Sequence, residues 1–410
     1  MTNENRRPRA LVVVGAGASV EYGIPATAGF GDLIEAAVAS DDYCRHTGGD
    51  AVYRDVRNAL TQYYGKPQEA HFERIYHVMH ELARFEVTPG AIARFRPVMR
   101  PFLELVGTYP EHALRAACST MLRAIYQKVS SVCAAPRVPY APLTRFFERL
   151  ERQWIPRVYT TNYDDFIGQA TGDRYFTGFD IPHADHLRFD GAAFWSRWNQ
   201  PGLFHLHGSV HMGFPRHSTD IGDIGWYPSR DEASMVAEFS GSGVDRMDGT
   251  SIDRGAIITG LDKLGRLQQS PYCFYYAGLS RDVMEADVVF VLGSGLADLH
   301  LNTWLKQVRR LKPTLPLLYV GWWDGDTLDL YNAFNADYGD LEIALHHELG
   351  LTMHRVAPHQ YKAVDGWTID ADSAGAVWAD GFQSFLAHPQ ALDDVLERLG
   401  ASRTAVVELS

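Results

Sequence analysis

The sequence predicts an α/β fold built on a parallel sheet, with a large helical insertion and a C-terminal helical extension. Six short apolar runs, most of them rich in β-branched residues, show the continuous apolarity of strands that are covered on both faces. Long intervals separate the runs, as expected for parallel strands joined by crossover connections. From about 40 to 150, apolar residues instead recur at helical spacing. The predicted strands are 10–14, 157–160, 203–207, 256–258, 288–292 and 317–320.

Composition limits the classes of protein to which this chain can belong. Apolar residues make up 46% of its 410 residues, which is enough for a sizeable core and too many for a largely disordered chain. At about 150 residues per domain, this length suits two or three domains. The net charge of −12 argues against a surface that neutralises phosphates, so we expect no direct contact with nucleic acid.

The cysteines and the apolar runs also bear on metal content and cellular location. The four cysteines include no Cys-x-x-Cys pair, so we expect no bound metal, and their scarcity favours a reducing cytoplasm. The sequence has no run of about 18 apolar residues, which argues against a membrane span. Arg6-Arg7 before an apolar run resembles a twin-arginine export signal, but Gly15 and Gly17 interrupt that run. We favour a buried strand that enters a glycine turn.

The chain divides into three predicted regions that differ in the pattern of their apolar residues. The sheet domain carries the six predicted strands and is interrupted by the helical insertion, and the C-terminal extension follows it. The predicted bounds are 1–36 with 155–325 for the sheet domain, 37–154 for the insertion and 326–410 for the extension.

Turn-forming and helical patterns place further elements within these regions. Proline and glycine at 88–90 and 135–136 are expected to end the two main helices of the insertion. The stretch 171–255 is rich in glycine, aspartate and aromatic residues and predicts long loops. Helices are expected near 381–387 and 390–399.

The first predicted strand runs directly into a glycine-rich turn, Gly-Ala-Gly-Ala-Ser at 15–19, followed by Gly-Ile-Pro at 23–25. Two glycines allow the backbone to approach a pyrophosphate, and the start of the next helix adds amide hydrogens and a positive dipole. The third glycine of the dinucleotide-binding fingerprint is missing, because position 20 is valine. Taken alone, the motif is explained equally well by a tight turn between a strand and a helix.

Three later motifs also follow predicted strands. They are Thr-Thr-Asn-Tyr-Asp at 160–164, Leu-His-Gly at 206–208 and Gly-Ser-Gly-Leu-Ala-Asp at 293–298. Open α/β sheets bind ligands outside the carboxyl ends of their strands, where these motifs are expected. Strand alternation predicts that His205 and His207 share one face. Each motif alone also has a structural explanation: a helix cap, a hydrogen-bonded core histidine or a tight turn.

In their order and spacing, the four motifs together resemble those of the sirtuin family. They suit in particular its bacterial branch of sirtuin-like effectors of antiphage defence that hydrolyse NAD+, in which the form Thr-Thr-Asn-Tyr-Asp is typical. The resemblance covers the sheet domain, about 8–36 and 155–325. It implies a Rossmann-like sheet that binds NAD+.

The resemblance also implies roles for individual residues. Asn162 and Asp164 match the element near the nicotinamide ribose and carboxamide, and His207 matches the catalytic histidine of the family. These three are the predicted catalytic residues. The other matched positions are expected to bind the dinucleotide: Gly15, Ala16, Gly17 and Ser19 along the phosphates, Pro25 and Thr161 on the nicotinamide side, and Gly293 and Ser294 at the adenosine ribose and phosphates, with Asp298 completing the set.

The chemistry of NAD+ suggests how the three catalytic residues act. Nicotinamide leaves as a neutral molecule, so no general acid is needed, and stabilising an oxocarbenium-like transition state dominates catalysis. We expect Asn162 to position water near the anomeric carbon, Asp164 to hold the carboxamide, and His207 to accept a proton.

Departures from the family pattern indicate which molecule accepts the ADP-ribosyl group after nicotinamide leaves. Sirtuin deacetylases carry a zinc module with two Cys-x-x-Cys pairs after the catalytic histidine, whereas Cys273 alone follows His207 here. The insertion is also larger than a deacetylase needs. We therefore expect water as the acceptor and an NAD+ glycohydrolase that releases nicotinamide and ADP-ribose. A non-catalytic sensor of NAD or ADP-ribose, or less readily an NAD-dependent protein deacylase, is the alternative.

The resemblance further implies a biological setting and partners. It suggests an effector that depletes NAD+ in abortive infection and is controlled by another protein, because the region after 325 is short for a sensing module. A HerA-type hexameric ATPase is the expected partner. A homo-oligomer formed through the insertion or the tail is also expected.

Overall fold

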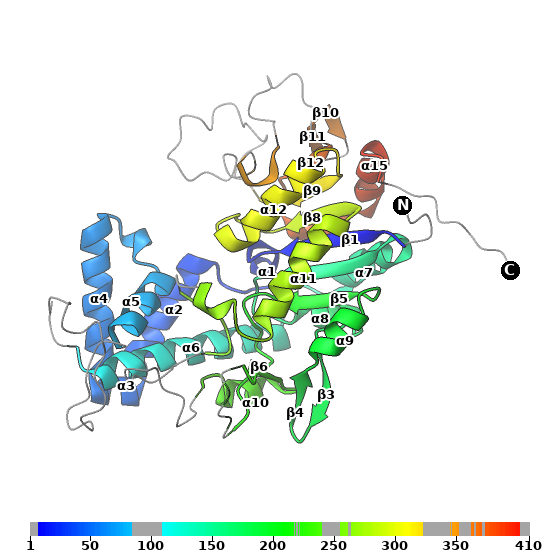
Figure 1. Cartoon of the computed structure of the whole chain (residues 1–410). Helices are drawn as coiled ribbons and strands as arrows, with labels where there is room; N and C mark the ends of the chain where they lie inside the picture. The colour runs from blue at the N-terminus through cyan, green and yellow to red at the C-terminus, as the bar shows by residue number, and fades with distance from the viewer. Residues whose placement is uncertain are drawn as a thin grey trace.

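A largely parallel sheet forms the centre of the protein, as the sequence predicts (Figure 1). The computed structural model describes residues 7–83, 109–216, 218, 220, 222–239, 255–260, 264–322, 345, 347–351, 362–364, 366–370 and 374–401. The main sheet has eight strands in the order β10-β11-β12-β9-β8-β1-β2-β5. The pairings from β12 to β5 are parallel, and those of β10 with β11 and of β11 with β12 are antiparallel. The strands are β1 (Arg9–Val14), β2 (Ile155–Thr160), β5 (Gly202–His205), β8 (Val288–Leu292), β9 (Leu317–Val320), β10 (Lys362–Val364), β11 (Trp367–Asp370) and β12 (Gly375–Trp378).

The chain extends the sheet from β1 in both directions. β2 and β5 lie on one side of β1, and β8, β9 and β12 lie on the other. Val14, the last residue of β1, is paired with Thr160 of β2 and Leu292 of β8. A ligand crevice forms where the strand order reverses in this way, outside the carboxyl ends of the strands. The topology therefore brings the four sequence motifs to one edge of the sheet.

Both faces of the sheet are covered, which explains the continuous apolarity of its strands. All six strands of the parallel block are buried along their length. Successive residues of β1 serve two different cores: Val12 belongs to one, and Val13 belongs to the other. Two cores on opposite faces need two helical layers.

Helices supply a layer on each face. On the Val12 face, Phe146 of α7 meets Phe290 of β8 edge-on, with ring centroids 5.9 Å apart, and Phe385 of α14 at 5.4 Å. On the Val13 face, α11 and α12 contribute buried residues such as Leu279 and Leu305. The helices on or beside the sheet are α1 (Gly17–Val20), α7 (Ala141–Gln153), α8 (Phe166–Thr171), α9 (Gly191–Ser196), α11 (Tyr272–Glu285), α12 (Leu299–Leu311), α14 (Phe382–Ala387) and α15 (Pro389–Arg398).

In the described part of the predicted insertion the regular elements are helices, and α6 lies at its centre (Figure 1). Its four preceding α-helices all contact α6, whose 24 residues bury an apolar stripe at helical spacing. α6 ends beside the prolines predicted to stop it, whereas the predicted stop at 88–90 lies outside the described residues. The domain boundaries, including 37–154, stay predictions. The helices gathered around α6 (Glu111–Ala134) are α2 (Thr27–Ser40), most of which precedes residue 37, with α3 (Asp42–Thr47), α4 (Gly49–Tyr64), η1 (Pro67–Glu69) and α5 (Phe72–Ala83).

Three expectations about strands need correction. The apolar run 256–258 is buried but joins no sheet; Ile258 donates its amide to the carbonyl of His207 at 2.8 Å. The strand predicted over 203–207 ends at His205, because the chain turns before Gly208, whose φ is +88°. The tail holds the predicted helices α14 and α15, but β10, β11 and β12 extend the sheet there as well.

The stretch predicted as long loops contains a second, small antiparallel sheet. Its strand order is β3-β4-β7-β6, and it lies below the main sheet in Figure 1. The elements of this region are β3 (Phe179–His183), β4 (His186–Phe189), β6 (Met212–Gly213), β7 (Gly225–Trp226), α10 (Arg230–Met235) and η3 (Leu264–Arg266).

In the described residues, we find no helix long and apolar enough to cross a membrane.

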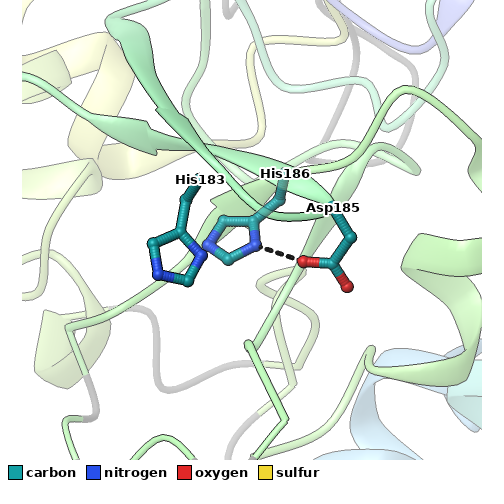
Figure 2. A group of neighbouring side chains, drawn as sticks. All are labelled: His183, Asp185 and His186. Atoms are coloured by element: carbon teal, nitrogen blue, oxygen red, sulfur yellow. Dashed lines mark hydrogen bonds and ion pairs between the residues drawn. The ribbon is translucent and has the colours of Figure 1, made fainter.

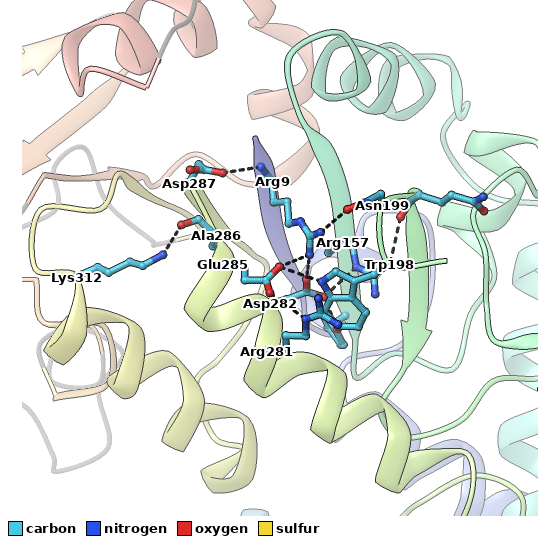
Figure 3. Close-up of polar contacts among 12 residues, drawn as sticks. Arg9, Arg157, Trp198, Asn199, Arg281, Asp282, Glu285, Ala286, Asp287 and Lys312 are labelled. Atoms are coloured by element: carbon cyan, nitrogen blue, oxygen red, sulfur yellow. Dashed lines mark hydrogen bonds and ion pairs between the residues drawn. The ribbon is translucent and has the colours of Figure 1, made fainter. Parts of the chain in front are cut away.

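A buried ionic network lies near the amino ends of β1 and β2, opposite the predicted site (Figure 3). Asp282 of α11 accepts hydrogen bonds from Arg157 Nε at 2.9 Å and from the Tyr159 hydroxyl at 2.6 Å. Arg9 Nη1 lies 3.5 Å from the same carboxylate. The Arg157 guanidinium also lies 4.3 Å from the centroid of Trp198. This edge of the sheet is therefore held by paired charges.

Candidate active site

One cavity of about 590 Å³ lies at the carboxyl edge of the sheet, beyond β1, β2 and β8. It brings together most of the residues that the four motifs predict. Gly17 and Gly293 are absent from its lining and lie behind it. The predicted residues that line it are Gly15, Ala16, Ser19, Pro25, Thr161, Asn162, Asp164, His207, Ser294 and Asp298.

The two glycine turns pack directly on each other, backbone against backbone. Gly17 donates its amide to the carbonyl of Gly293 at 2.8 Å, and Gly15 donates to Leu292 at 2.9 Å. A Cβ on Gly17 would lie 2.8 Å from the Gly293 oxygen. Gly293 has φ +61°, and a Cβ there would lie 2.0 Å from the Ala18 nitrogen. Glycine is thus required at 17 and 293 for turn-to-turn packing.

The turn after β1 offers a bound phosphate fewer free backbone amides than the start of a long helix would. The amides of Gly17, Ala18 and Ser19 are already bonded within the two turns. The helix that follows, α1, has only four residues, so its dipole is small. The helix-terminus contribution expected from the sequence is accordingly weak.

The Asn162 side chain is oriented by two neighbours from the first motif. Its Nδ2 donates to the Gly15 carbonyl at 2.9 Å and to Ser19 Oγ at 2.7 Å. A carbonyl oxygen can only accept a hydrogen bond, so the amide group must face Gly15 with its nitrogen. Oδ1 is then left as an acceptor, and it is buried with no hydrogen-bond partner in the described part of the chain. This orientation makes Asn162 an acceptor toward a bound molecule.

Asp164 continues the same hydrogen-bond chain. Ser19 Oγ donates to its Oδ2 at 2.6 Å, and the amide of Phe166 donates to its Oδ1 at 3.3 Å. Burial raises the pKa of the carboxyl to about 6, although the Ser19 hydrogen bond opposes that shift. The network therefore runs from Asn162 through Ser19 to Asp164. Its existence gives Asp164 a positioning function in addition to the predicted contact with the carboxamide.

His207 is paired with Asp298, which the sequence had assigned to cofactor binding. Nε2 of the imidazole lies 2.8 Å from Asp298 Oδ2. The other oxygen of Asp298 caps α12 by accepting the amides of His300 and Leu301 at 3.0 and 3.2 Å. With a carboxylate at Nε2, a neutral ring carries its hydrogen there and its lone pair on Nδ1. In this pair His207 can act as a base, and the Asp298 carboxylate fixes the orientation of its ring.

His205 faces a different cavity from His207, contrary to the shared face predicted by strand alternation. It lines a neighbouring space of about 1010 Å³ together with Asp165, His211 and Trp226. Its Nδ1 lies 3.2 Å from the Asn162 carbonyl oxygen, and burial lowers its pKa to about 4. Because the strand ends at His205, alternation does not continue to His207. His205 remains neutral and supports the backbone of Asn162 from behind.

The insertion also contributes residues to this cavity, which the sequence did not predict. His71, Glu73 and Arg74, at the start of α5, line it opposite the motifs. Arg74 donates to the Glu69 carbonyl at 2.9 Å and pairs with the Glu69 carboxylate. Burial lowers the pKa of His71. No motif marks these residues, since only the tertiary fold brings α5 to the sheet edge.

Comparison with known proteins finds a family model similar to the region that carries the later motifs. Residues 156–338 match the family model described as the SIR2-like domain. No curated protein sequence matches the chain. A Sir2 homologue in complex with NAD aligns at 12% identity and a TM-score of 0.41, covering 95% of this chain and 90% of that one. A mutant Sir2 homologue with ADP-ribose aligns at 11% and 0.38, covering 97% and 95%. The region that carries Asn162 and His207 is thus similar to the SIR2-like domain family.

Proposed function

We propose that this protein is an NAD+ glycohydrolase that cleaves NAD+ to nicotinamide and ADP-ribose. The observation that carries the proposal is the convergence of Asn162 and the His207–Asp298 pair on one cavity. Its volume of about 590 Å³ falls within the range of ligand sites, roughly 300–1,000 Å³. The similarity of 156–338 to the SIR2-like domain supports NAD+ as the substrate.

The proposed reaction breaks the bond between the ribose anomeric carbon and the pyridinium nitrogen. The electron pair leaves with nicotinamide, which departs neutral without needing a proton. Asn162 Oδ1 accepts a hydrogen bond from a ribose hydroxyl or from the attacking water. The water oxygen bonds to the anomeric carbon, and its proton passes to His207 Nδ1. Base catalysis of this kind contributes about 10²–10⁴-fold.

Asp298 and Asp164 support these steps from behind the reacting atoms. Asp298 holds the His207 ring in the tautomer that leaves Nδ1 basic and stabilises the imidazolium that forms. Asp164 accepts from Ser19, which in turn accepts from the Asn162 amide and fixes its direction. We propose that Asp164 also contacts the nicotinamide carboxamide, as the family resemblance implies.

The direct test is to incubate the purified chain with NAD+ and to separate the products by chromatography. We expect nicotinamide and ADP-ribose from the wild type, and a loss of at least about 10²-fold in Asn162→Ala and His207→Ala. His46→Ala, at an exposed position on α3, is the matched control and should keep full activity. Circular dichroism should show that every variant is folded.

The same preparation separates the alternatives. Tight NAD+ binding by calorimetry without any turnover, alone and with every partner tried, would contradict the hydrolase and favour a sensor. Transfer of an acyl group from an acyl-lysine peptide would favour a deacylase. The lack of paired cysteines after His207 counts against that last reaction.

We propose further that the activity depletes NAD+ during antiphage defence in the cytoplasm. A homo-oligomer and a HerA-type hexameric ATPase are the proposed assembly and partner. Co-purification of the two proteins, with NAD+ loss after phage infection only when both are expressed, is the expected result. Equal NAD+ loss in the absence of the ATPase would contradict the proposed control.

A further inference from the structure

A pair of histidines lies outside the active-site cavity, at the tip of the β3–β4 hairpin. His183 ends β3 and His186 begins β4, and the two are paired directly across the turn. Their ring centroids are 4.7 Å apart. Figure 2 shows the two imidazoles side by side, with Asp185 on the far side of His186.

The environment of His186 fixes which of its nitrogens can bind a ligand. Its Nδ1 lies 2.8 Å from Asp185 Oδ1. An ionised carboxylate only accepts hydrogen bonds, so Nδ1 carries the hydrogen, and in the neutral ring Nε2 carries the lone pair. The side chain is 2% exposed, and Nε2 is buried with no hydrogen-bond partner in the part of the chain that the structure describes. Such an orphaned acceptor is costly unless something binds it.

Packing holds the His186 ring in place while His183 lies open to solvent. The ring of Tyr227 packs against that of His186, with centroids 5.3 Å apart. Gly225 lies against its edge, where even a Cβ would be 2.5 Å from His186 Cδ2. His183 is exposed, so its ring can turn to share a ligand with Nε2 of His186. One ligand atom from each of His183, Asp185 and His186 lies within 4.8 Å of the others.

We propose that this hairpin binds a divalent first-row transition ion, with Zn²⁺ as the probe, through His186 Nε2 and a ring nitrogen of His183. Neutral imidazole is a preferred ligand for such ions. Asp185 has the arrangement of an orienting carboxylate, which accepts from the far nitrogen of a metal-binding histidine. Water completes the coordination, because the hairpin tip is open to solvent. The site shares no residue with the active-site cavity and stands apart from the NAD+ chemistry.

The test measures metal stoichiometry on the untagged full-length chain after a chelator has removed bound metal. Titration of Zn²⁺ against a chromophoric chelator should show one equivalent bound per chain. His183→Ala and His186→Ala should each abolish that equivalent. Asp185→Ala should weaken binding about 10–100-fold, because the tautomer and ring direction are no longer fixed.

Two controls separate this site from other metal ligands. His46→Ala on α3 and Cys273→Ser on α11 should both leave the equivalent intact. Co²⁺ spectra should lack the charge-transfer bands of thiolate ligands. One equivalent that persists in both histidine variants, or no bound Zn²⁺ in the wild type, would overturn the proposal. NAD+ cleavage is measured in parallel and should be unchanged by His183→Ala, so failure here does not bear on the proposed function.

Discussion

At the level of single residues, the contact between His207 and Asp298 decides which imidazole nitrogen can act as a base. We expect Asp298→Asn to lower kcat for NAD+ cleavage by about 10²–10⁴-fold with little change in KM, because an amide can donate to Nε2 and favour the wrong tautomer. Asparagine is also a good helix cap, so α12 should keep its start. Steady-state kinetics and a thermal melt check both points. Wild-type kcat in this variant would contradict the assigned role.

Asp164 gives a prediction about pH, because its buried carboxyl is harder to ionise in the folded protein. Folding raises its pKa from 3.8 to about 6, so the folded state holds a proton that the unfolded chain releases. The free energy of unfolding therefore falls as pH rises from about 4 to above 6, by about 3 kcal/mol at most.

We expect Asp164→Asn to remove that pH dependence. At pH 7 it should raise the free energy of unfolding by about 2 kcal/mol. Asparagine keeps one oxygen to accept the Phe166 amide, but about 1 kcal/mol is lost because it has no second oxygen to accept the Ser19 hydroxyl. NAD+ cleavage should fall in the same variant. Urea unfolding at pH 4.5 and pH 7 provides the measurement. If the free energy of unfolding differs between the two pH values by as much in the variant as in the wild type, Asp164 is not the buried carboxyl that causes the pH dependence.

The sequence predicted most of the residues at this site but not how they are paired. Polar residues after buried strands gather at the carboxyl edge of a parallel sheet, which places Asn162, Asp164 and His207 near one another, whereas their predicted catalytic roles come from the family resemblance. The contact of Asp298 with His207 was not predictable, because it depends on the exact path of the turn after β8. His71 and Arg74 were missed for a similar reason, since nothing local marks the start of α5 as part of a cavity.

At the level of elements, the two glycine turns test whether glycine serves packing or flexibility. Gly293→Ala should lower the free energy of unfolding by about 3 kcal/mol or more, because its φ is +61° and its new Cβ would collide with the backbone at Ala18. Gly17→Ala should cost less, because its new Cβ comes no nearer than 2.8 Å to Gly293 and the backbone at 17 needs no positive φ. Gly295→Ala, with no atom within 4 Å of its new Cβ, is the matched control and should stay within about 1 kcal/mol. Chemical denaturation ranks the three variants, and a different order would refute the packing argument.

Elements were predictable where a strand is both long enough and apolar throughout. The strands at 288–292 and 317–320 are confirmed residue for residue. The run 256–258 is as apolar as a strand, but the burial that it signals comes from loop packing rather than from a sheet ladder. β12 was missed because Gly375–Trp378 begins with glycine and alanine, which favour strands less than the leucines, tyrosine and valine of the equally short β9.

At the scale of the whole molecule, the sheet separates chemistry from stability. The cavity lies beyond the carboxyl ends of the strands, while the charged network of Figure 3 lies toward their amino ends. Arg157 and Asp282 are each 1% exposed, and burial opposes the charge on both. Both stay ionised because each charge compensates for the hydration that the other has lost on burial.

We therefore expect Asp282→Asn to destabilise the protein without altering catalysis. The change keeps the shape of the side chain but leaves the buried Arg157 without its paired charge, which costs about 3–5 kcal/mol. Asp42→Asn breaks an ion pair with Arg45 whose acid is 92% exposed, and it should cost less than about 1 kcal/mol. Denaturant unfolding at pH 7 compares the two variants, and NAD+ kinetics at low temperature should match the wild type in both. If Asp282→Asn were as mild as Asp42→Asn, the network would contribute little to stability; if it lowered kcat while the fold persisted, the two edges of the sheet would be coupled rather than separate.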